Sequence, residues 1–81
     1  MNTREDVLAW LRAELVELLE IEPESVTPEA TLADLDVDSI DAVDIVVNFR
    51  ELTGRRVDPE VFRNVRTIGD VVEALYGLVR A

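Results

Sequence analysis

The 81-residue chain contains no cysteine, no histidine and no lysine. The absence of cysteine excludes disulfides, thiolate metal sites and a cysteine nucleophile. The absence of histidine and lysine excludes a serine–histidine catalytic pair and a Schiff-base lysine. Acid–base chemistry by carboxylates is still conceivable, but so small a chain leaves little room for a substrate cleft. We therefore expect a protein that is not an enzyme.

Long apolar runs are also absent. No run approaches the roughly 20 residues of a membrane span, and the start, MNTREDVLAW, lacks the apolar segment of a secretory signal. We expect a cytoplasmic protein without membrane insertion, monomeric, with a single domain over residues 1–81. A start at Met1 and an end soon after the last predicted helix favour a free-standing protein, although an excised module would look alike.

Positive charge is missing from the middle of the chain, and the formal net charge is −10. Residues 13–49 hold eleven acids and no base, whereas residues 50–81 hold five acids and six arginines. This distribution disfavours nucleic acid and anionic membranes as partners. It favours a basic protein surface or cations, with plain solvation as the alternative.

Capping signals predict where helices begin and end. A Thr or Asp followed three residues later by Asp forms a capping box, and this pattern predicts helix starts near Thr3, at Asp38 and at Thr67. The first helix should end before Pro23, and the second should stop at Gly54. Apolar side chains at helical spacing then define three core-facing stripes. They are Val7, Leu8, Leu11, Leu15, Leu18 and Leu19; Ala42, Ile45, Val46, Phe49 and Leu52; and Ile68, Val71, Val72, Leu75, Leu78 and Val79.

Between the second and last helices, VDPEVFRN predicts a short helix capped by Asp58 with Pro59 as its first residue. Residues 21–37 form a long connector, pinned by Val26, Leu32 and Leu35, and no segment sustains the alternation of a strand. The predicted fold is all-α: a small four-helix bundle of three longer helices and a short third helix, with a long loop between the first two helices.

The second predicted helix carries an additional apolar stripe. Ile40, Val43 and Val47 lie together about 140° around the helix from its core face. A small bundle rarely buries both sides of one helix, and three acids, Asp41, Asp44 and Glu51, lie beside this stripe. We predict that it is an exposed protein-docking surface, the alternative being that the connector covers it.

The stretch DLDVDSIDAVDI, residues 34–45, begins like an EF-hand loop, but Ser39 stands where that loop needs glycine and Ile45 where it needs glutamate. A hydrolase serine would lack both the G-x-S-x-G motif and a histidine. Ser39 is then either an ordinary first residue of a helix or a place for a phosphate ester, which the positive end of the helix dipole favours.

The longer stretch DLDVDSIDAVDIVVNF resembles the phosphopantetheine attachment motif of acyl carrier proteins, whose Asp-Ser-Leu core opens helix II. RTIGDVVEAL resembles the start of the family's last helix, and residues 57–68 fit its short third helix. The resemblance covers essentially the whole chain. It implies that Ser39 receives 4′-phosphopantetheine from coenzyme A, and that a thioester on this arm holds an acyl, polyketide or aminoacyl intermediate.

The resemblance also implies partners. They are a phosphopantetheinyl transferase, which binds coenzyme A and magnesium, an acyltransferase or ligase that loads the arm, and a ketosynthase or other acyl-processing enzyme. The residues implied in docking are Asp38, Ile40, Asp41, Val43, Asp44, Val47 and Val65.

Three features depart from the family pattern. Asp36 stands where glycine is usual, which puts the loop's turn in doubt, and Arg50 occupies a place that is often acidic. Arg55 and Arg56 add positive charge after the second helix, and together the arginines favour a specialised pathway over housekeeping fatty acid synthesis. Two alternatives are an unmodified acidic helical adaptor that docks a basic partner and, less favoured, a calcium-responsive acidic helical protein.

Overall fold

Each α-helix begins where its capping box predicts. In the computed structural model, which describes residues 2–80, the side chain of Thr3 accepts the Asp6 amide at 3.1 Å and starts α1 (Arg4–Leu19). Asp38 starts α2 (Ser39–Thr53), and Thr67 accepts the Asp70 amide at 3.1 Å before α3 (Ile68–Arg80). The predicted all-α fold is confirmed. The ends of the predicted domain, residues 1 and 81, lie outside the described residues.

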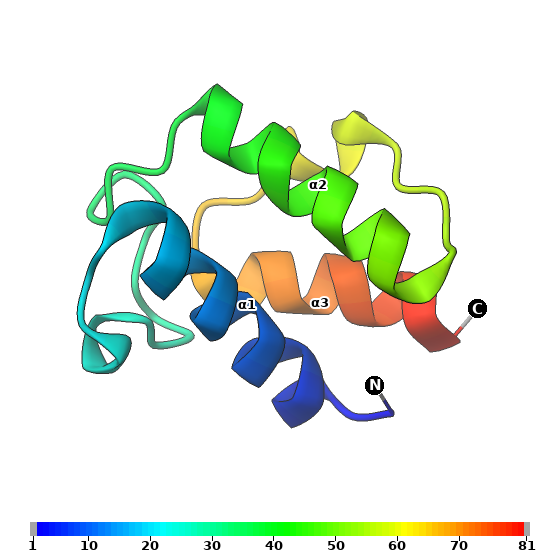
Figure 1. Ribbon diagram of the computed structural model, residues 1–81, viewed down its shortest axis with the longest axis horizontal. Helices are drawn as coiled ribbons and strands as arrows, with labels where there is room; N and C mark the ends of the chain where they lie inside the picture. Colours follow the sequence, from blue (N-terminus) through cyan, green and yellow to red (C-terminus); the bar gives the residue numbers. More distant parts are fainter. Residues whose placement is uncertain (1, 81) are drawn as a thin grey trace.

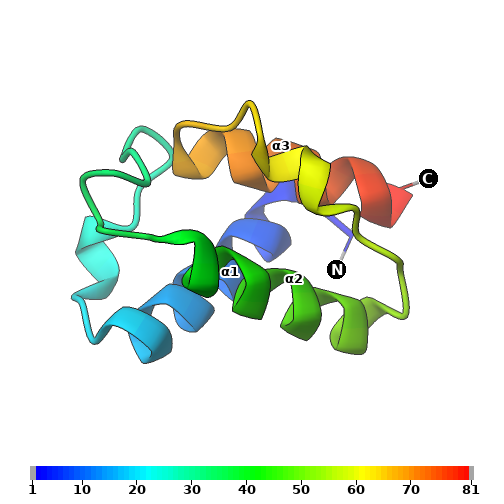
Figure 2. The same cartoon turned by 90° about the horizontal axis from the view of Figure 1, so that it is seen from above.

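The three α-helices form the body of the molecule. α1 runs antiparallel to α2 and α3, and the connector lies at the end where α2 and α3 begin (Figure 1). Figure 2 shows the same arrangement from above. Within residues 2–80, no helix combines the length and the apolarity needed to cross a bilayer.

The predicted apolar stripes meet in one core. α1 packs more extensively against α3 than against α2. The rings of Trp10 and Phe49 meet edge to face, with centroids 5.3 Å apart. Among the described residues, the buried hydrophobic side chains are Val7, Leu11, Leu15, Val26, Ile45, Phe49, Val57, Ile68, Val71, Val72 and Leu75.

Two details of the prediction are wrong. The short third helix forms only as η2 (Pro59–Phe62), a 3-10 turn that Asp58 caps by accepting the Glu60 amide at 2.9 Å. Four residues, of which the first is a proline, are too few for an α-helix to propagate. Leu52, predicted in the core, is 56% exposed, because α1 and α2 leave a surface depression between them at the last turn of α2.

The connector contains a second 3-10 turn, η1 (Pro23–Ser25), and is tied to the start of α3 by backbone pairing that the sequence did not predict. The Leu32 amide donates to Arg66 O at 2.9 Å, and the Ile68 amide donates to Ala30 O at 2.8 Å. At Gly69 a Cβ atom would lie 3.1 Å from Pro28 O, so glycine allows the connector and the start of α3 to approach this closely. This pairing fixes the connector that leads into α2.

Candidate functional site

Ser39 is the first residue of α2, and its side chain is exposed. Within residues 2–80, no protein group makes a hydrogen bond with its hydroxyl. The first turn of a helix has backbone N–H groups without intrahelical acceptors, and these give it a partial positive charge. The structure therefore places a solvent-accessible hydroxyl at the end of a helix that favours an anionic ester.

The hydroxyl of Ser39 is available because its neighbours provide the cap. Asp38 Oδ1 accepts the Asp41 amide at 2.9 Å, and Asp41 Oδ2 accepts the Asp38 amide at 3.3 Å. This reciprocal capping box fixes the start of α2 without the serine side chain. The prediction that Asp38 is the N-cap and Asp41 its partner is confirmed.

The turn before this cap contains Asp36, which has a φ of 57°. This is the left-handed region that glycine enters most readily, and aspartate is among the few other residues that tolerate it. The Asp36 amide donates to Ala33 O at 3.1 Å, and the Val37 amide donates to Leu32 O at 3.0 Å. Aspartate thus supports a positive-φ turn at the position where the resemblance predicts glycine.

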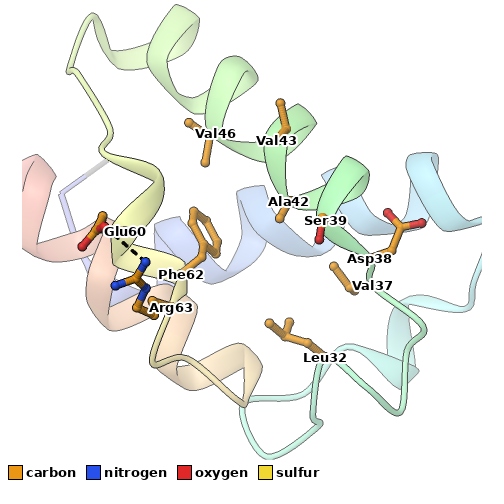
Figure 3. Close-up of a pocket in the computed structure, with 10 residues that line it drawn as sticks. All are labelled: Leu32, Val37, Asp38, Ser39, Ala42, Val43, Val46, Glu60, Phe62 and Arg63. Atoms are coloured by element: carbon orange, nitrogen blue, oxygen red, sulfur yellow. Dashed lines mark ion pairs between the residues drawn. The ribbon is translucent and has the colours of Figure 1, made fainter.

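A pocket of about 520 Å³ opens beside Ser39, between α2 and η2. Figure 3 shows Phe62 projecting into it opposite the first turns of α2, with Glu60 and Arg63 at the edge away from Ser39. Arg63 Nη2 lies 3.5 Å from Glu60 Oε1. The lining residues are Leu32, Val37, Asp38, Ser39, Ala42, Val43, Val46, Glu60, Phe62 and Arg63.

Sequence reasoning did not find this pocket. It predicted only that Ser39 opens the second helix, and the structure adds that Ser39 lines the pocket. The lining comes from the connector, α2 and η2, which are far apart in the chain and meet only in the fold. The one signal of the pocket in the sequence was Phe62. A large aromatic side chain in a helix as short as η2 must pack against another element.

The additional apolar stripe of α2 is exposed. Ile40 is 72%, Val43 55% and Val47 45% exposed, so the connector does not cover these side chains. We call these three residues the α2 strip. Asp44 is exposed next to it, whereas the carboxylate of Asp41 is engaged in the capping box. Val65 is not on α2 but in the segment between η2 and α3, where it is half-buried against the hydrophobic core.

The acids around Ser39 do not form a metal site. Among the described residues, no three carboxylates come together in an arrangement that could hold a metal ion. Asp34 instead uses its backbone amide in a turn, donating to Thr31 Oγ1 at 3.0 Å. The geometry gives no support to the calcium-responsive alternative.

Comparison with known proteins identifies relatives over most of the chain. A family model described as "Phosphopantetheine attachment site" matches residues 9–75. The chain is similar to "Acyl carrier protein 2" of Ralstonia nicotianae, at 48% identity over 80 residues, which cover 98% of this chain and 99% of that protein. It is 39% identical over 71 residues to the "Meromycolate extension acyl carrier protein" of Mycolicibacterium smegmatis, covering 86% of this chain and 72% of that protein. An acyl carrier protein of Thermotoga maritima is 36% identical over 73 residues, which cover 89% of this chain and 90% of that protein.

Proposed function

This chain belongs to the acyl carrier protein family, and from that premise we propose that Ser39 carries its 4′-phosphopantetheine arm. Proteins of this family hold acyl intermediates on phosphopantetheine attached covalently to a serine. The chain has only two serines, and they occupy very different places. Ser25 ends the three-residue 3-10 turn η1, whereas Ser39 opens the fifteen-residue α-helix α2. This contrast is the observation that carries the proposal.

The first turn of α2 suits a phosphodiester. The ester would be anionic, and the backbone amides at the start of a long α-helix favour negative charge. The Asp38 carboxylate bonds to the Asp41 amide at 2.9 Å, so attachment at Ser39 leaves the hydrogen bond that fixes this turn in place. Ser39 is the attachment point, coenzyme A is the donor, and a phosphopantetheinyl transferase makes the bond.

The arm supplies a thiol that holds the cargo as a thioester, and the pocket beside Ser39 is where we expect the protein to shelter that cargo. Apolar side chains such as Leu32, Val46 and Phe62 dominate its lining. An apolar acyl or polyketide chain would lose contact with water there, at a gain of about 25 cal/mol per Å² of buried apolar area. A charged aminoacyl group would gain much less. The pocket thus favours acyl or polyketide cargo.

We propose that the α2 strip and Asp44 form the surface on which partner enzymes dock. The strip combines exposed aliphatic side chains with an adjacent acid, and its first residue, Ile40, directly follows Ser39. The partners that bind this apolar and acidic surface would include the transferase, a loading acyltransferase or ligase, and a ketosynthase or other acyl-processing enzyme. Asp38, Asp41 and Val65 remain predicted docking residues. The carrier itself holds and presents substrate without catalysing a step.

Attachment is tested by measuring intact mass after incubation with coenzyme A, magnesium and a promiscuous phosphopantetheinyl transferase. We expect the wild type and Ser25→Ala to gain one phosphopantetheine group, and Ser39→Ala to gain none. Circular dichroism should show Ser39→Ala folded, because alanine is a good helix former and the cap belongs to Asp38. A wild type that gains no mass would favour the unmodified adaptor. A Ser39→Ala variant that still gains the mass would show that the arm is attached to another residue.

The docking surface is tested by the rate of loading at low salt. Asp44→Arg should slow loading by the same transferase about tenfold, because charges beside an interface act mainly by steering association. Glu24→Arg is the matched control, since Glu24 is exposed in η1 and its reversal changes the net charge equally. Added salt should reduce the difference in loading rate between Asp44→Arg and the wild type, because it screens the charges. Equal rates for the two variants at low salt would remove the α2 strip as the docking face.

A further inference from the structure

A second depression lies on a different side of α2 from the α2 strip. Four large hydrophobic side chains are strongly exposed among the described residues, and three of them form the strip. The fourth, Leu52, is nine residues after Val43, which places it about 180° away around the helix. It lines a depression of about 480 Å³ between α1 and α2. The lining residues are Trp10, Glu14, Glu17, Leu18, Asn48, Glu51 and Leu52.

The floor of this depression is held in place. The Trp10 ring packs edge to face on the buried Phe49, and α1 and α2 are bridged by Asn48 Nδ2, which donates to Glu14 Oε2 at 2.8 Å. This bond uses one acceptor position of Glu14, and a carboxylate has about four. The carboxylates of Glu14, Glu17 and Glu51 therefore keep capacity to accept hydrogen bonds.

The chemistry of the lining selects an occupant. Every charged residue that lines the depression is an acid, and these acids surround an aromatic ring and two leucines. A guanidinium group bonds carboxylates through planar, paired N–H donors and stacks on aromatic faces, which an ammonium group does less well. An aliphatic side chain would cover Leu52. A metal ion fits less well, because no three carboxylates in the described part of the chain are arranged to hold one.

We propose that this depression is a second docking site, which takes an arginine-bearing segment of a partner protein with an aliphatic residue among its arginines. The site is separate from Ser39 and from the α2 strip. A partner can therefore engage it whether or not the arm is loaded. Together the two surfaces let α2 contact a partner on two sides.

The only tryptophan of the chain lies in this depression, so its fluorescence reports binding directly. The unmodified full chain is titrated at low salt with the blocked peptide acetyl-Arg-Leu-Arg-Arg-amide, and with acetyl-Ser-Leu-Ser-Ser-amide as control. We expect a saturable change in Trp10 emission with the arginine peptide only. The triple variant E14Q/E17Q/E51Q should bind it about tenfold more weakly, from the summed loss of three surface charge pairs.

The matched control is E22Q/E24Q/E29Q, which removes three exposed acids of the connector and changes the net charge equally. It should bind within about twofold of the wild type, and Leu52→Ser should weaken binding while circular dichroism stays unchanged. Equal weakening by both triple variants would show attraction to net charge and overturn the proposal. So would the absence of any saturable change, or backbone NMR shifts centred on the α2 strip. None of these results bears on attachment at Ser39, because the protein used is unmodified.

Discussion

Replacing Asp38 separates the two things this residue does, capping α2 and carrying charge next to Ser39. Its Oδ1 accepts the Asp41 amide at 2.9 Å, and its own amide donates to Asp41 at 3.3 Å. Asp38→Ala removes the first of these bonds and the charge together. Asp38→Asn keeps a carbonyl oxygen in the same place and removes only the charge. Asparagine and aspartate are about equally good N-caps.

The expected drop in melting temperature for Asp38→Ala can be estimated from the free energy of the N-cap and the number of residues that unfold. Loss of an N-cap costs about 1 kcal/mol. With an unfolding entropy of about 2.1 cal/mol/K per residue, 81 residues give about 170 cal/mol/K. A loss of 1 kcal/mol should therefore lower the melting temperature by about 6 °C. The total stability of such a chain is about 4–12 kcal/mol, so Asp38→Ala should still be folded at room temperature.

Thermal unfolding followed by circular dichroism, together with the loading assay, tests this reasoning. We expect Asp38→Ala to melt about 6 °C below the wild type, and Asp38→Asn and Ser39→Ala to melt within about 2 °C of it. A wild-type melting temperature for Asp38→Ala would show that the capping box does not hold α2. An equal loss in Asp38→Asn would assign the effect to charge. Slow loading of a stable Asp38→Asn would support the predicted docking role of this carboxylate.

Two further predictions concern charge. The pKa of Asp70 is lowered from its ordinary value of 3.8, first because its carboxylate accepts the Arg66 amide and then because it accepts the Thr67 amide. A lowered folded-state pKa stabilises the fold above pH 3.8, and this contribution is lost as the pH falls through the folded-state value. The difference in urea midpoint between wild type and Asp70→Asn should therefore shrink in acid, and a difference independent of pH would contradict this. Millimolar magnesium or calcium should raise the melting temperature to a similar extent, because eleven acids without a base between residues 13 and 49 repel one another. A stoichiometric response to calcium alone would instead revive the calcium-responsive alternative.

The features predicted correctly from the sequence are those that depend on local bonding. Each capping box joins residues three apart, so Thr3, Asp38 and Thr67 could be identified as helix starts without knowledge of the fold. The position of Ser39 at the start of α2 follows from the same local rule. Its role as attachment site remains a prediction from the family and the helix end.

The features that were wrong or missed depend on how helices approach one another. Leu52 is at core spacing on α2, but spacing along one helix cannot show where α1 diverges from it. The pairing of the connector with the start of α3 joins Leu32 to Arg66, more than thirty residues apart in the chain. The pocket beside Ser39 is a product of that same long-range arrangement. The exposure of the α2 strip, by contrast, was predicted correctly, and the fold was needed only to exclude the alternative that the connector covers it.

The position of the α2 strip relative to Ser39 would link the proposed docking to presentation of the cargo. From Ser39 to Val47 the helix rises about 12 Å, at 1.5 Å per residue, so along the helix axis the whole strip lies within that distance of the proposed attachment point. If Ser39 carries the arm as proposed, a partner bound along the strip would hold the base of the arm beside its own surface. The capping box keeps this geometry fixed, because Asp38 and Asp41 hold the first turn that carries Ser39. We infer that a rigid start of α2 matters to function mainly because a partner that binds the strip is then also held in a fixed position relative to the arm.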